Sequence, residues 1–192
     1  MKDYMFREIR QMAYMCTSET FDATLRYWQE AAGAGPFWTI EARPENQIYR
    51  GKPTAGAIEA AIGYVGNQQV EIIRPLNDAP SPWTDALQSA SDVPPAGLFH
   101  HFLLETDDFD RAVADLLAAG ARDGLTAEVV GGRRVAYVDA QATFGCWVEV
   151  MQWQPFSPVV ASLMRDRSRD WDGTNPRRSY LEVIEEAQAR TS

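Results

Sequence analysis

The sequence predicts an α+β fold in which two tandem βαβββ modules lie side by side and form a cleft. Three observations predict it. The order strand, helix, strand, strand, strand occurs twice; the apolar spacing changes from a period of about two to about 3.6 and back; and a stretch rich in Pro, Ser and Asp separates the copies. We expect a single domain, 1–192, with module one at about 8–76, a linker at 77–96, module two at about 97–153 and a C-terminal extension at 154–192.

The first module opens on an apolar run of strand length. We expect its strands at 10–17, 37–42, 57–65 and 68–76. A helix is predicted at 18–33, because apolar residues recur there at spacings of three or four. Ser18 is its expected N-cap, and Gly33 stands at its end. Gly66 and Asn67 form the expected hairpin turn between the last two strands.

The second module repeats this order. We expect its strands at 98–106, 127–130, 133–140 and 146–153. A helix is predicted at 107–121, with Asp107 or Asp108 as its cap and Gly120 at its end. In the C-terminal extension the spacing predicts one short amphipathic helix at 179–190, which covers the cleft, packs on a partner subunit or lies on the solvated surface.

The bulk composition narrows the class of protein. The net charge is −9, which argues against nucleic acid and anionic membranes as partners because both need a basic face. No apolar run approaches the roughly 18 residues of a membrane helix. Cys16 and Cys146 lie far apart and are expected to be reduced thiols. The N-terminal stretch lacks the apolar core of a signal peptide, so we expect a cytoplasmic protein.

Four polar residues interrupt the first and last strands of the two modules. They are Gln11, Glu71, His101 and Glu149. A carboxylate inside an apolar strand is costly unless it is paired or bound to a cation. For the glutamates the alternative is an outward-pointing side chain, and for His101 a satisfied core histidine. His100 should point to the opposite face of its strand, with a structural role or a contact behind the ligands. One imidazole, two carboxylates and one amide oxygen suit a divalent ion of borderline hardness.

The order and spacing of several stretches resemble a known family. They are RQMAYM, LRYWQEAAGAGPFW, NQQVEIIRPL, GLFHHFLLETDDFDRAV and GGRRVAYVDAQATFGCWVEVMQ, and they cover roughly residues 10 to 153. The chain resembles the vicinal oxygen chelate (VOC) superfamily, in particular the glyoxalase I and methylmalonyl-CoA epimerase group. The resemblance implies a divalent metal held by Gln11, Glu71, His101 and Glu149, a set similar to that of eukaryotic glyoxalase I. It also implies a homodimer, with the cleft formed within one chain or across two.

The resemblance implies a metal-dependent lyase or isomerase of the glyoxalase or epimerase type. It would move a proton next to a carbonyl through a metal-stabilised enolate, with Glu149 as the base and Glu71 as its near-symmetric partner. The mixed ligand set does not choose among zinc, nickel, cobalt, manganese, magnesium and iron. We expect a hydrophobic carbonyl substrate, contacted by Trp38, Phe102 and Trp147. The alternatives are a metal-free binding or sequestration protein of the same fold, and an interaction module with an inactive site.

Overall fold

The predicted repeat is present in the computed structural model, which describes residues 8–191. The strands are β1 (Ile9–Met15), β2 (Phe37–Ala42), β3 (Glu45–Tyr49), β4 (Lys52–Pro53), β5 (Ile58–Val65), β6 (Gln68–Pro75), β7 (Leu98–Thr106), β8 (Arg122–Val129), β9 (Arg133–Ala140), β10 (Cys146–Gln152) and β11 (Arg177–Ser179). The helices are α1 (Phe21–Ala32), α2 (Pro82–Ser89), α3 (Phe109–Ala118), α4 (Gln141–Phe144), α5 (Ser157–Arg169) and α6 (Tyr180–Thr191). The N-terminal stretch that we expect not to be a signal peptide lies mostly outside these residues.

The two modules are joined edge to edge in one sheet. Its strand order is β11-β2-β5-β6-β1-β7-β10-β9-β8-β3-β4. The first strands of the modules, β1 and β7, pair antiparallel at the centre, and each pairs in parallel with the last strand of its own module, β6 or β10. Because β1 and β7 belong to one chain, the space between the modules is formed within that chain.

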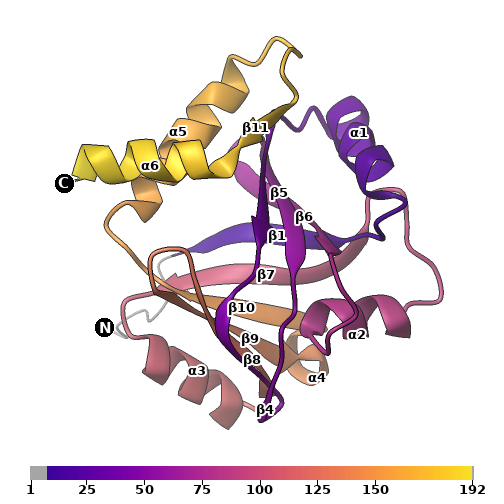
Figure 1. The fold of residues 1–192 in the computed structure, drawn as a ribbon, viewed down its shortest axis with the longest axis vertical. Coiled ribbons are helices and arrows are strands. Elements are labelled where there is room, and N and C mark those ends of the chain that lie inside the picture. The colour runs from indigo at the N-terminus through magenta and orange to yellow at the C-terminus, as the bar shows by residue number, and fades with distance from the viewer. Residues whose placement is uncertain (1–7, 192) are drawn as a thin grey trace.

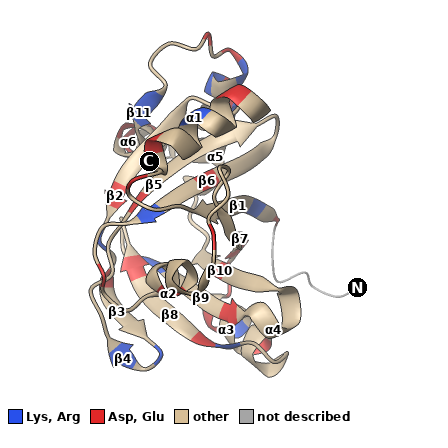
Figure 2. Cartoon of the chain, turned by 90° about the vertical axis from the view of Figure 1, so that its right-hand side faces the viewer, with Lys and Arg blue, Asp and Glu red and all other residues tan. Residues whose placement is uncertain are grey.

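A segment of the first module crosses to the far edge of the sheet. The hairpin β3–β4 pairs with β8 of the second module, whereas β2 pairs with β5. The chain after β2 therefore bridges the two halves along one edge (Figure 2). This hairpin was not predicted from the sequence, because β3 is mostly exposed. Within β3 only Gln47 and Tyr49 are buried. Without a run of alternating apolar residues, its pattern resembles that of a loop.

The elements that were predicted are present and differ from their predicted positions only at their ends, whereas α4, α5 and β11 were not predicted. Asp108 caps α3, as predicted, and accepts a hydrogen bond from the amide of Arg111. The prediction of Ser18 as the cap of the first helix was wrong, because Thr20 holds that position. Thr17 and Thr20 bond to each other through their hydroxyls and amides, and this local turn delays the helix until Phe21. The linker contains a helix of its own, α2.

The sheet curls, and its two faces are covered by different helices. On the outer face, α1 packs over Val70 and Ile72 of β6, and α3 packs over β9 and β10. On the inner face, residues of β5 and β6 contact residues of β8 and β9, which are far apart in the strand order. The linker helix α2 fills one end of this inner space with Trp83. The helices α5 and α6 cover the other end (Figure 1).

The C-terminal extension is part of the core rather than a loose tail. The helix predicted at 179–190 is present as α6, and α5 precedes it. Both pack on Trp38 and Ile62, and Met164 between them is fully buried. The remaining inner space between these helices and α2 is a cavity. No helix among residues 8–191 has both the length and the hydropathy to span a membrane.

Candidate functional site

Three side chains from three strands near the centre of the sheet converge inside its curl. Glu71 of β6, His101 of β7 and Glu149 of β10 place ligand atoms within 4.8 Å of one another. His101 Nε2 lies 2.9 Å from Glu149 Oε2 and 3.7 Å from Glu71 Oε2. The strand between β6 and β7 carries Ala13 at the matching position, and its small side chain lets Glu71 and His101 approach each other. The sheet register thus brings the three together.

The site concentrates negative charge away from water. Glu71 and Glu149 are only 8% and 3% exposed, and His101 is fully buried. Burial, and then the charge of Glu149, raise the pKa of Glu71 well above its ordinary value. Glu71 Oε2 is buried without a hydrogen-bond partner. The chemistry of two adjacent carboxylates and one imidazole nitrogen fits a divalent metal.

Gln11, predicted as the fourth ligand, lies on the same wall. It is buried on β1, two residues from Ala13, and therefore faces the same side of the sheet. Gln11 lines the same cavity as Glu71 and Glu149. Its role as a ligand stays a prediction, because no contact joins its amide to the other three side chains.

The two histidines point to the same side of the sheet, which corrects the expectation for His100. Tyr14 pairs with Phe99, and Ala13 pairs with His101, so that His100 is the extra residue of a β-bulge. A bulge interrupts the alternation of a strand. Both rings therefore point inward, with His100 Nδ1 at 2.8 Å from His101 Nδ1. Behind them, His100 Nε2 lies 3.2 Å from the carbonyl oxygen of Pro82 at the start of α2.

The two carboxylates open onto a cavity of about 340 Å³. His101 is not among the residues that line it, so only Glu71 and Glu149 of the three present their side chains to its contents. Its wall is largely aliphatic, with Ile40, Ile58, Ile62, Leu103, Val160 and Ile184. Tyr180 of α6 also lines it, with its pKa raised by burial. That the C-terminal extension lines the cavity was not predicted. The apolar face of the helix predicted there was the feature of the sequence that could have indicated it.

The three aromatic residues expected to contact substrate do not line the cavity. Trp38 is buried beneath α5 and α6. Phe102 points to the outer face, where its ring packs edge-on against Phe144. Trp147 lies on the inner face but stacks on His100, with ring centroids 6.0 Å apart. Aromatic composition therefore did not separate these three residues from Tyr137, Phe156 and Tyr180, which do line the cavity.

A second buried charge cluster lines one side of the cavity and was also missed. Glu105, 1% exposed on β7, forms an ion pair with Arg10, 2.6 Å away, and accepts a hydrogen bond from Arg133. Arg10 also donates to the carbonyl oxygen of Ser157, and Arg133 to that of Gln152. The signal was a glutamate within an apolar strand, the same signal that marked Glu71. Because each arginine is paired, we interpret this cluster as a link between the sheet and the start of α5.

The raised pKa of Glu71 predicts how stability depends on pH in metal-free protein. A carboxyl group whose pKa is higher in the folded state contributes stability that is present below its unfolded value, near 4.5, and lost as pH rises through the folded value. Above about pH 4.5, the free energy of unfolding should therefore gain a downward slope, at most about 1.4 kcal/mol per pH unit for one proton. Glu71→Gln should remove this component.

This pH dependence can be measured by urea denaturation in the presence of a chelator at a series of pH values. Glu182→Gln on the exposed side of α6 is the matched control and should follow the wild-type curve. If wild type and Glu71→Gln give parallel curves, the pKa of Glu71 is not raised by folding, and the charge argument for the site is wrong.

Comparison with known proteins places the chain in a family. A sequence profile of the glyoxalase/bleomycin resistance protein/dioxygenase superfamily matches residues 10–137, which is more than half of the chain. The protein therefore belongs to this superfamily, the VOC superfamily predicted from the sequence. A search of curated proteins gave no significant match.

Solved structures share the fold at low sequence identity. They include a selenomethionine form of methylmalonyl-CoA epimerase (TM-score 0.50, 21% identity, 80% of this chain and 99% of that one) and the methylmalonyl-CoA epimerase from Mycobacterium tuberculosis (0.53, 12%, 83% and 96%). A hypothetical protein from Bacillus halodurans C-125 is similar to the same degree (0.50, 14%, 77% and 94%). At these identities the likeness shows the fold alone, and the α+β architecture with paired βαβββ modules agrees with it.

Proposed function

We propose that the protein is a metal-dependent lyase or isomerase that moves a proton next to the carbonyl group of a small apolar substrate. The observation that carries the proposal is that Glu71, His101 and Glu149 converge at the wall of a cavity. Of these three residues, Glu71 and Glu149 line the cavity and His101 does not. Two structural neighbours are epimerases by name, and inversion of a centre next to a carbonyl requires a proton to be removed and returned.

The residues divide into holding and proton-moving roles. Glu71, His101 and Glu149, with Gln11 beside them, would hold one divalent ion. When bound, that ion supplies Lewis-acid stabilisation of negative charge on the carbonyl oxygen of the substrate. Glu149 takes the proton, and Glu71 serves as its partner for the return.

The cavity supports a compact, apolar substrate without a large anionic handle. Its volume of about 340 Å³ is at the lower end for small-molecule sites. Its rim carries Glu41, Glu45 and Glu128 against Arg43, whereas the charges of Arg10 and Arg133, which also line the cavity, are paired with Glu105. Coenzyme A and glutathione carry phosphates or carboxylates, which such a rim would repel. We therefore favour a hydrophobic carbonyl compound over a CoA ester, although the neighbours include methylmalonyl-CoA epimerases.

The test is deuterium exchange in D₂O with a panel of carbonyl compounds. An enzyme that abstracts a proton next to a carbonyl exchanges it whatever the final product, so the assay does not require knowledge of the pathway. We expect exchange with small apolar ketones or aldehydes, dependent on added divalent metal, and none with CoA esters. Tight binding without exchange would favour the metal-free sequestration protein. Exchange only with CoA or glutathione adducts would refute the proposed substrate class. The homodimer and the cytoplasmic location remain predictions.

A further inference from the structure

The contact between the two histidines determines where their protons lie. A carbonyl oxygen can only accept, so the 3.2 Å contact of His100 Nε2 with Pro82 requires the proton of His100 on Nε2. In the neutral ring the other nitrogen, Nδ1, then carries a lone pair. This nitrogen lies 2.8 Å from His101 Nδ1, which must donate the proton between them. In neutral His101 the lone pair is therefore on Nε2, which faces Glu71 and Glu149. If the ring takes up a second proton, that proton is also on Nε2.

We propose that His100 is a positioning residue that fixes the tautomer of His101 and so presents its Nε2 atom as a ligand to the site. This proposal rests on the proposed function in one respect, namely that His101 Nε2 binds a metal ion. In metal sites the second nitrogen of a ligating histidine usually donates to a carboxylate or a carbonyl. Here a neutral imidazole takes that place, in direct contact, and a carbonyl oxygen lies behind it.

The environment of His100 holds its ring in place. His100 is 2% exposed and stacks on Trp147, with ring planes 20° apart. With the carbonyl oxygen of Pro82 beside Nε2, the neutral ring presents Nδ1 as an acceptor for the hydrogen bond from His101. The bulge in β7 is therefore what brings an acceptor to this position, since a regular strand would turn His100 outward.

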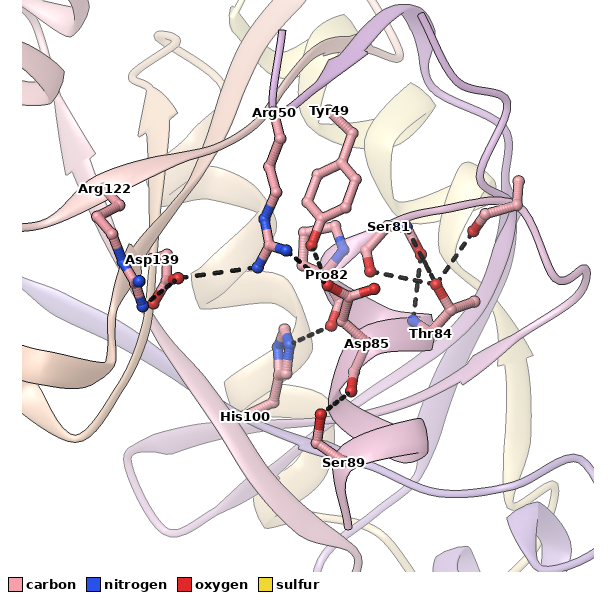
Figure 3. A network of polar contacts seen from close by, with 11 residues as sticks. Tyr49, Arg50, Ser81, Pro82, Thr84, Asp85, Ser89, His100, Arg122 and Asp139 are labelled. Carbon is pink, nitrogen blue, oxygen red and sulfur yellow. Dashed lines mark hydrogen bonds and ion pairs between the residues drawn. The ribbon is translucent and has the colours of Figure 1, made fainter. Parts of the chain in front are cut away.

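The acceptor for His100 is held by the linker helix. The start of α2 is closed by a capping box in which the Ser81 and Thr84 side chains bond to each other's amides. One turn further, Asp85 accepts from the hydroxyl of Tyr49 at 2.7 Å and pairs with Arg50 (Figure 3). These contacts fix the carbonyl oxygen of Pro82 toward His100. The linker between the modules thus affects the site indirectly: Pro82 orients the ring of His100, and His100 orients the ring of His101.

The protons can be observed directly, because the chain contains only two histidines. Protein with ¹⁵N-labelled histidine gives nitrogen spectra of these two rings alone. We expect a proton on His101 Nδ1 and a scalar coupling from this N–H across the hydrogen bond to His100 Nδ1. The measurement applies to metal-free and Zn²⁺-loaded protein alike. His101 protonated on Nε2 only, or the absence of the coupling, would overturn the proposal.

Metal affinity tests the consequence. His100→Phe keeps a ring but removes the acceptor, and we expect about 10–100-fold weaker binding of Zn²⁺ in a competition titration. His100→Asn restores an acceptor near the position of Nδ1 and should recover most of the affinity. Leu125→Ala, which removes a different buried side chain of the same inner core, should lower the melting temperature but not the affinity.

The outcomes separate this inference from the proposed function. Wild-type affinity in a folded His100→Phe variant would refute the role of His100 and leave the metal site intact. If wild type binds no divalent ion, the proposed function fails, and the nitrogen spectra alone decide whether His100 sets the tautomer. If His100→Phe does not fold, His100→Asn and the wild-type spectra provide the decision.

Discussion

Glu149→Gln is expected to lower turnover by about 10²–10⁴-fold while the protein stays folded, because a positioned general base contributes about that much. The amide cannot take a proton from the substrate. The amide nitrogen of the new glutamine can, however, donate a hydrogen bond to His101 Nε2. It would occupy the position of Glu149 Oε2, which lies 2.9 Å from His101 Nε2 in the wild-type protein. The change also removes one of two adjacent buried negative charges, so the metal-free variant should unfold at the same or a higher temperature than wild type. Turnover is measured as deuterium exchange at saturating metal.

The control for this prediction is the same substitution on another strand of the sheet. Glu59 of β5 pairs with Arg74 at 2.5 Å and does not line the cavity. Glu59→Gln should therefore lose some stability and keep its exchange rate. Metal content is measured in both variants, since a loss of metal from Glu149→Gln would mimic the loss of a base. Full activity in a metal-loaded Glu149→Gln variant would refute the role of Glu149 and shift it to Glu71.

The sequence predicted the strands that carry the site better than it predicted what surrounds them. Glu71, His101 and Glu149 could be found because each is polar within an apolar strand at an equivalent place in the repeat. Strand alternation is local, and it is visible in sequence. The sheet register that places Ala13 between Glu71 and His101 is not local, yet the repeat fixes it, because equivalent strands of the two modules meet at the centre.

The failures arise where long-range pairing overrides the local pattern. The bulge at His100 depends on how β7 pairs with β1, and a single extra residue reverses the face of a side chain. The crossing of β3 to β8 likewise depends on a partner more than 70 residues away, as the pairing of Ile48 with Thr126 illustrates. The three aromatic residues predicted to contact substrate lie away from the cavity for a different reason: composition does not distinguish Trp38 beneath α5 and α6 from a side chain that lines the cavity.

His101→Ala is expected to abolish stoichiometric metal binding, whereas wild type should carry about one divalent ion per chain by elemental analysis. His101 is the only nitrogen donor of the three-residue group, and its loss leaves Glu71 and Glu149 facing each other. Two carboxylates without the imidazole fit a transition metal poorly and favour sharing a proton instead. In wild type, metal at 100 times its dissociation constant should stabilise the fold by about 2.7 kcal/mol, and this gain should vanish in the variant.

The control and the possible outcomes decide what the site is for. Cys146 is a thiol outside the three-residue group, and Cys146→Ala should keep both the metal and the thermal shift, which excludes adventitious binding by sulfur. Metal retained in full by His101→Ala would mean that the carboxylates, with Gln11, suffice as ligands. If wild type takes up no metal even after reconstitution, the buried charge of Glu71 and Glu149 must be balanced by protons alone. That result would favour the metal-free binding protein of the same fold, since the cavity remains while the Lewis acid needed for the proposed proton transfer is missing.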